Sequence, residues 1–381
     1  MNNSLIHRLC IMIVCLTTIH ANARHATTQP VLAETQPGAT SVVLRGHTGS
    51  VISSAAYNLE GTRILTASSD GTVRIWDAAT GKELAVLRGH RQAIQTATFS
   101  PDGKRIVTAS FDKTAHIWNV DTGEVVTTLT DPESVLWSAE FSPDGKRVVT
   151  GSGDKTARVW NVANGQELTV LRHEDDVLDA TFTHDGKRIL TRSGDKTARI
   201  WDAESAEELA VFRGHENAVY SATFSPDEKR VVTTSSDKTV RIWDTATGRE
   251  LAVLRGHESY VYIAVFSPDG KRFLTASADK TVRIWDAATG KEFVVLSGHE
   301  KACGSAAFSP NGEHVVTASA DKTARLWDAD SGKELAVLNG HEGAVSFAIF
   351  SPDGRRILTT SSDKTARIWN IEDALNQAER K

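Results

Sequence analysis

Histidine, threonine and aspartate recur together along this chain, and these residue types can activate a nucleophile by passing a proton between them. In each set a threonine stands four residues before an aspartate, and a tryptophan stands six residues after that aspartate. Seven sets also have an upstream histidine. They are His47, Thr66, Asp70 and Trp76; His90, Thr108, Asp112 and Trp118; His173, Thr191, Asp195 and Trp201; His215, Thr233, Asp237 and Trp243; His257, Thr275, Asp279 and Trp285; His299, Thr317, Asp321 and Trp327; and His341, Thr359, Asp363 and Trp369.

The number of these sets argues against catalysis. A catalytic group need not occur in every repeat, whereas a buried polar network that fixes a repeated backbone must. The histidines fall in different repeats, too far apart to share one metal ion. The chain also has no H-E-x-x-H, G-x-S-x-G or glycine-rich phosphate motif. We therefore interpret the sets as structural and expect no catalytic residue, no metal site and no cofactor. The single histidines His116, His184 and His314 are expected at the surface.

The elements that carry these residues belong to one sequence unit that is repeated eight times. The tryptophan of a W-D or W-N pair recurs every 42 residues, with one interval of 41. Each unit holds four short β-prone runs separated by turn residues, and in the second unit the runs are Glu83–Leu87, Ile94–Phe99, Ile106–Ala109 and Ala115–Trp118. Four antiparallel strands per unit, repeated radially, predict a propeller.

The repeat resembles the WD-repeat family, which begins with G-H and ends with W-D at a period of about 40–45 residues. The resemblance covers residues 41–371, and phrases such as "DKTARIWD" followed by "TGKELAVLRGHE" are similar to bacterial members. It implies that each His, Thr, Asp and Trp set is a hydrogen-bonded tetrad. It also implies a propeller that acts as a protein-binding platform. The eight complete repeat sets predict an all-β, eight-bladed β-propeller of four-stranded antiparallel blades.

The ends of the repeat region indicate how the ring closes. No fourth strand follows Trp369, so we expect the run Ser41–Leu44 to complete the last blade beside Thr365–Trp369. Seven blades, the commoner number in the family, would require one repeat to be left out, and none is degenerate enough. In the third repeat Asp131-Pro132 replaces G-H, and the fourth has lost the Gly before His173. We expect these two blades to be the least rigid.

Positions that vary between repeats are the candidates for function. Three of them resemble the partner-contacting positions on the top face of WD-repeat propellers, and large or charged residues gather there in repeats two to six. Phe111, Tyr260 and Trp137 are expected to be the most exposed. The predicted partner-binding residues are Gln95, Phe111, Trp137, Asp176, Leu178, Tyr220, Tyr260 and Tyr262. The alternative is that the aromatic residues fill a wide channel mouth.

The N-terminus has the features of an export signal. Arg8 precedes an apolar run, Leu9–Leu16, and Ala21-Asn22-Ala23 matches a cleavage site. We expect residues 1–23 to be a signal peptide, 24–40 a flexible lead-in and 372–381 a tail with a short helical turn. The protein would then be periplasmic or secreted, without membrane insertion after cleavage. If the segment is not a functional signal, a cytoplasmic location follows.

Charge and composition narrow the partners. The chain has 43 Lys+Arg against 48 Asp+Glu, a net charge of -5, so no overall basic excess draws it to nucleic acid. We expect a monomeric scaffold with a protein or peptide partner. Two alternatives stay open: an exported propeller enzyme of the quinone-dependent dehydrogenase or lactonase type, and an envelope assembly factor that binds unfolded chains by strand addition.

Overall fold

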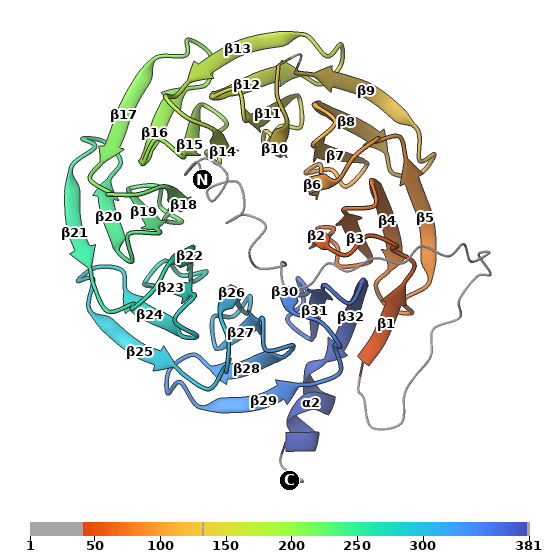
Figure 1. The fold of residues 1–381 in the computed structure, drawn as a ribbon, viewed down its shortest axis with the longest axis vertical. Coiled ribbons are helices and arrows are strands. Elements are labelled where there is room, and N and C mark those ends of the chain that lie inside the picture. The colour runs from red at the N-terminus through yellow and green to blue at the C-terminus, as the bar shows by residue number, and fades with distance from the viewer. Residues whose placement is uncertain (1–40, 132, 379–381) are drawn as a thin grey trace, which may run out of the picture.

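The computed structural model describes residues 41–131 and 133–378, and the expected signal peptide and lead-in lie outside them. The described residues form eight four-stranded antiparallel sheets arranged radially around one axis (Figure 1). The eight-bladed propeller expected from the repeats is therefore confirmed. In every blade the second strand of a sequence repeat lies innermost, and the perimeter strand is the first strand of another repeat.

The strand bounds follow the repeat. Blades one and two are β2 (Ile52–Tyr57), β3 (Arg63–Ser68), β4 (Thr72–Asp77), β5 (Glu83–Arg88), β6 (Ile94–Phe99), β7 (Arg105–Ser110), β8 (Thr114–Asn119) and β9 (Val125–Thr130). Blades three and four are β10 (Leu136–Phe141), β11 (Arg147–Ser152), β12 (Thr156–Asn161), β13 (Glu167–Arg172), β14 (Val177–Phe182), β15 (Arg188–Ser193), β16 (Thr197–Asp202) and β17 (Glu208–Arg213).

Blades five and six are β18 (Val219–Phe224), β19 (Arg230–Ser235), β20 (Val240–Asp244), β21 (Glu250–Leu254), β22 (Val261–Phe266), β23 (Arg272–Ser277), β24 (Val282–Asp286) and β25 (Glu292–Leu296). Blade seven is β26 (Cys303–Phe308), β27 (His314–Ser319), β28 (Ala324–Asp328) and β29 (Glu334–Leu338). Blade eight is β30 (Val345–Phe350), β31 (Arg356–Ser361), β32 (Thr365–Asn370) and β1 (Ser41–Arg45).

The chain closes the ring as expected. Strand β1 pairs antiparallel with β32, so that Ser41 lies opposite Trp369. Pairing the first strand with the last blade leaves no sheet of the ring with a missing strand. Beyond β32, where only a short helical turn is expected, the helix α2 (Ile371–Ala378) packs against β29 and β32. Its Ile371 and Ala374 are buried in the core between blades seven and eight.

Turn chemistry ends each inner strand in the same way. In the S-P-D-G turn after β6, Ser100 Oγ donates to Asp102 Oδ1 at 2.5 Å, and Gly103 N donates to Ser100 O at 2.8 Å. Gly103 has a φ of 67°, a conformation that glycine adopts without strain. These turns define the bottom face of the ring, and the opposite face, where the inner strands begin, is the top face.

The apolar core lies between neighbouring blades. Trp118 of blade two packs against Val73, Ile75 and Leu87 of blade one, and all four side chains are buried. Equivalent clusters join the other blades around the ring. Each blade is thus stabilised by burial of apolar surface against both neighbours.

Candidate functional site

The His, Thr, Asp and Trp side chains form one hydrogen-bonded chain in seven blades of the described ring. In blade five, Trp243 Nε1 lies 2.8 Å from Thr233 Oγ1, His215 Nε2 lies 2.8 Å from the same oxygen, and His215 Nδ1 lies 2.8 Å from Asp237 Oδ2. An indole N–H can only donate, so the threonine hydroxyl has its own hydrogen left for His215 Nε2. The imidazole then donates from Nδ1 to the carboxylate, which fixes its neutral tautomer.

The other six tetrads repeat this geometry inside their blades. Each indole N–H donates to the threonine hydroxyl: Trp76 to Thr66 at 2.9 Å, Trp118 to Thr108 at 3.0 Å, Trp201 to Thr191 at 2.8 Å, Trp285 to Thr275 at 2.8 Å, Trp327 to Thr317 at 2.9 Å and Trp369 to Thr359 at 2.8 Å.

Each imidazole in these six blades joins its threonine to its aspartate. The Nδ1 atoms of His47, His90, His173, His257, His299 and His341 lie 2.7–3.0 Å from Asp70, Asp112, Asp195, Asp279, Asp321 and Asp363 respectively.

Burial separates the tetrads from any partner surface. The threonines Thr66, Thr108, Thr191, Thr233, Thr275, Thr317 and Thr359 are 0% exposed. Their tryptophan partners, Trp76, Trp118, Trp201, Trp243, Trp285, Trp327 and Trp369, are also buried. Although the residue types are those of a reactive triad, the hydroxyl of each set is covered by its own blade. The threonine and tryptophan side chains of the tetrads therefore lie inside the ring.

The surroundings of the tetrads shift the pKa of three of the histidines and of their aspartate partners. Burial lowers the pKa of His90, His173 and His341, so these imidazoles are held neutral. Burial alone would raise the pKa of Asp112, but hydrogen bonds from Thr114, the Arg91 backbone and His90 lower it to about 2. A buried hydrogen-bond network of this kind fastens the top-face loop to the inner strands.

Blade three replaces the missing histidine with an ion cluster around Thr150, Asp154 and Trp160. Asp131 is 0% exposed, and its Oδ1 accepts the backbone N–H of Glu133 at 2.9 Å. Arg158 lies between three carboxylates, at 3.7 Å from Asp131, 2.6 Å from Asp154 and 2.6 Å from Glu167. A guanidinium therefore neutralises two buried acids in the place where other blades use a histidine. Sequence reasoning missed this role because an arginine stands at the same position in six other repeats.

Blade two has a histidine, His116, at the position where the other seven repeats have this arginine. His116 stacks on the tetrad ring of His90, with ring centroids 4.2 Å apart. Burial, and the charge that His90 would carry, lower the pKa of His116 to about 4. His116 is half-buried, so it is less exposed than expected, whereas the His184 side chain is 91% exposed, as expected of a surface residue. The outer strand of blade two also lacks the glutamate that pairs with arginine in most blades, which leaves room for a neutral ring.

The variable top-face positions form two separate aromatic groups. In blades five and six the ring of Tyr220 lies 6.4 Å from that of Tyr260, edge-on, and 6.1 Å from that of Tyr262, stacked. Tyr260 is 41% exposed, while Tyr220 and Tyr262 are half-buried. Blade four contributes half-buried Asp176 and Leu178 at the equivalent positions. A partly exposed tyrosine group is typical of a recognition surface.

The second group, in blades two and three, corrects the sequence prediction. Trp137 is 7% exposed, not exposed as expected, and the ring of half-buried Phe111 meets it edge-on at 5.2 Å. The indole is buried because the facing residue is a glycine: a Cβ built on Gly153 would lie 3.3 Å from Trp137 Nε1. Trp137 thus fills the wall of the ring, while Gln95 is half-buried in blade two.

The described residues bear on metal binding and on membrane insertion. No group of three or more His, Cys, Asp or Glu side chains there could hold a metal ion. No helix within residues 41–131 or 133–378 has the length and apolar character to span a lipid bilayer.

Comparison with known proteins agrees with this architecture. The family model described as "WD domain, G-beta repeat" matches residues 38–77, 81–119, 123–161, 165–202, 206–244, 248–286, 290–328 and 332–370. The WD repeat-containing protein pop1 of Schizosaccharomyces pombe is 48% identical over 65 residues, which is 17% of this chain and 7% of that protein. Dynein assembly factor with WD repeat domains 1 of Xenopus laevis is 40% identical over 52 residues, 14% of this chain and 12% of that protein.

Both matches span only a small part of the relatives' length. Among solved structures, the computationally designed Ika8 protein superposes with a TM-score of 0.78 and 29% sequence identity, covering 86% of this chain and 98% of that chain.

Proposed function

Because this chain belongs to the WD40 repeat family, we propose that it is a non-enzymatic platform that binds a protein or peptide through its top face. The observation that carries this proposal is the tyrosine group of Tyr220, Tyr260 and Tyr262, with Asp176 and Leu178 in the adjoining blade. Tyrosine offers a large apolar ring and a hydroxyl at low entropic cost, which suits it to an interface.

The repeats supply a control for this surface. The positions of Tyr260 and Tyr262 in blade six correspond to Val51 and Ser53 in blade one. The fold is satisfied by smaller residues at these positions, so large ones in blades five and six are not required for folding. This asymmetry supports one binding sector rather than a ring of equal sites.

The test is a paired affinity capture from an extract of the compartment in which the protein resides. Tyr260→Ala/Tyr262→Ala should lose a partner that the wild-type chain retains, and Val51→Ala/Ser53→Ala should retain it. Equal recovery by the two double variants would contradict binding through the tyrosine group. Thermal unfolding of both variants checks that the ring is intact.

We also propose that the protein is exported and works as a monomer. The support for export is the sequence of the first 23 residues, which lie outside the described structure. N-terminal sequencing of the protein recovered from its native host should begin at Arg24. A chain that still begins at Met1 in the cytoplasmic fraction would refute export.

A further inference from the structure

The bottom end of the ring axis is not uniform. The residue just before the aromatic that ends each inner strand is half-buried in all eight blades, and we call this set the axial ring. It consists of Ala56, Thr98, Glu140, Thr181, Thr223, Val265, Ala307 and Ile349. The set is polar in blades two to five and apolar in blades six, seven, eight and one. Because all eight positions are equivalent in the fold, the asymmetry is not required for folding.

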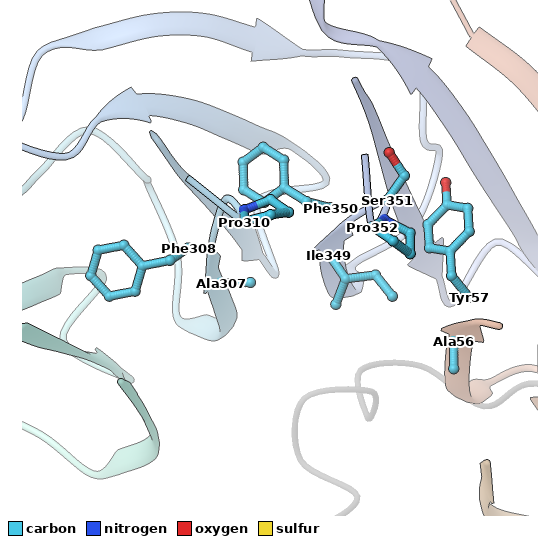
Figure 2. Close-up of a pocket in the computed structure, with 9 residues that line it drawn as sticks. All are labelled: Ala56, Tyr57, Ala307, Phe308, Pro310, Ile349, Phe350, Ser351 and Pro352. Carbon is cyan, nitrogen blue, oxygen red and sulfur yellow. The ribbon is translucent and has the colours of Figure 1, made fainter. Parts of the chain in front are cut away.

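A cavity of about 370 Å³ opens on the apolar side (Figure 2). Its walls are Ala56, Ala307 and Ile349 of the axial ring, the aromatic residues Tyr57, Phe308 and Phe350, and the proline turns of blades seven and eight. A cavity of this size and character accommodates one or two large apolar groups.

One lining residue has an unused hydrogen-bond donor. Tyr57 occupies a position where the seven other repeats carry phenylalanine. Its hydroxyl is buried and forms no hydrogen bond with the described residues. Burial raises the pKa of Tyr57 well above its usual value, so the hydroxyl stays protonated. Because the hydroxyl oxygen is closed to solvent, Tyr57 contributes its ring, and not its hydroxyl, to the lining of the cavity.

The opposite wall carries charges found in no other repeat. Blade four has Asp179 where the others have Ser, Thr, Ile or Phe, and Arg192 where the others have Ala, Gly or Thr. Arg192 Nε lies 3.4 Å from Asp179 Oδ2. Glu140 of blade three lies beside them and accepts the backbone N–H of Phe182. Arg192 therefore pairs with Asp179, while no ion pair is formed by Glu140 among the described residues, so an added cation would have the Glu140 carboxyl as its partner.

The two walls face each other across the axis. Blades three and four, with β10 and β14 innermost, lie opposite blades seven and eight, with β26 and β30 innermost (Figure 1). A ligand that uses both must reach from one side to the other. In an extended peptide, successive side chains point to opposite sides, so an apolar residue and its basic neighbour would face opposite walls.

We propose that the bottom end of the axis binds an extended peptide segment in which a lysine or arginine adjoins a large apolar residue. The apolar side chain enters the cavity, and the cation contacts Glu140 beside Asp179. This site lies on the face away from the tyrosine group, so it is independent of the proposed top-face function. Burial and the nearby Asp179 raise the pKa of Glu140 to about 8, and a bound cation would stabilise its ionised form.

The test uses fluorescence polarisation with a fluorescein-labelled nonapeptide of alternating leucine and lysine, at physiological salt. In one control peptide glutamate replaces each lysine, and in the other serine replaces each leucine. Wild-type protein should bind the leucine–lysine peptide at least about tenfold more tightly than either control. Equal affinity for the lysine and glutamate peptides would overturn the proposal.

The variants are taken from neighbouring repeats, so they suit the fold. Glu140→Thr matches Thr181 and should weaken the leucine–lysine peptide about tenfold and remove the preference for lysine over glutamate. Ile349→Thr should weaken binding while keeping that preference. Tyr260→Ala/Tyr262→Ala should leave binding unchanged. Undiminished binding by Glu140→Thr would show only non-specific attraction to a net acidic protein and would refute the site.

Discussion

The ion cluster of blade three permits a quantitative test of how this ring tolerates a missing histidine. Replacing Arg158 with alanine removes the only cation within ion-pairing distance of Asp131 and Asp154 among the described residues. Both carboxylates are buried, so neither regains full hydration. Leaving buried charge unpaired costs about 3–5 kcal/mol. We therefore predict that Arg158→Ala lowers the free energy of unfolding by about 3–5 kcal/mol.

Blade five provides the matched control. Arg241 occupies the same position and pairs with Glu250, whose side chain is 35% exposed. The tetrad carboxylate Asp237 remains bonded to His215 at 2.8 Å when Arg241 is removed. Arg241→Ala should therefore cost only about 1 kcal/mol, the range of a partly exposed ion pair together with lost packing of the side-chain stem.

The assay is urea unfolding at pH 7 for both variants, with hydrogen exchange to locate the weakened amides. Exchange should accelerate in β10–β13 for Arg158→Ala and stay near the wild-type rate in β18–β21 for Arg241→Ala. If the two variants lose the same free energy of unfolding within about 0.5 kcal/mol, then Arg158 does not replace the histidine and the reasoning fails.

Three further predictions follow from the tetrads and the aromatic positions. The pKa values of His90, His173 and His341 are lower in the folded than in the unfolded chain, so the unfolded chain binds protons at a higher pH than the folded chain does. The midpoint of thermal unfolding should therefore fall as the pH drops below about 6.5. The unfolding midpoint should fall a second time below about pH 4, because the tetrad aspartates, whose pKa values are also lowered, stabilise the fold only while they are ionised. An unfolding midpoint that stays constant from pH 7 to 5 would contradict the histidine contribution. Trp137→Ala should lower the free energy of unfolding by about 3–5 kcal/mol because the indole is buried. Tyr260→Ala should change it by less than about 1 kcal/mol. Chemical denaturation of the two variants measures both values. In the wild-type protein, amides of blades three and four should exchange fastest; uniform protection around the ring would show that the Arg158 cluster and the shortened loop before His173 are as rigid as the regular blades.

Most of the fold could be predicted from the sequence because every repeat has the same pattern of strand and turn residues. The spacing of the tryptophans determines the number of blades, and the unmatched run at Ser41 predicts the strand that pairs with β32. The predicted strands of the second unit differ from the observed ones by at most one residue at each end. The helix α2 was foreseen only as a turn, because its stability comes from packing on β29 rather than from its own short sequence.

The site was less predictable because exposure depends on the neighbouring blade. Trp137 is expected to be an exposed aromatic until Gly153 is seen to leave space for its ring. The role of Arg158 depends on Asp131, which lies far from it in sequence and adjacent to it in space. Glu140, Asp179 and Arg192 could have been found by comparing each position across the eight repeats, since no other repeat has a charge at any of the three positions.

Closing the ring with β1 imposes an order on folding. Blades one to seven are each continuous in sequence, so each can assemble once its own residues and a neighbour are available. Strand β1 is made first but cannot pair until β32 has been synthesised, and joining such distant segments carries a large loop-closure entropy. Until then the edge of β32 stays open to other chains, and a chain truncated before Thr365 leaves blade eight with no partner for its N-terminal strand. Completion of the ring therefore reports that synthesis of the chain has passed β32.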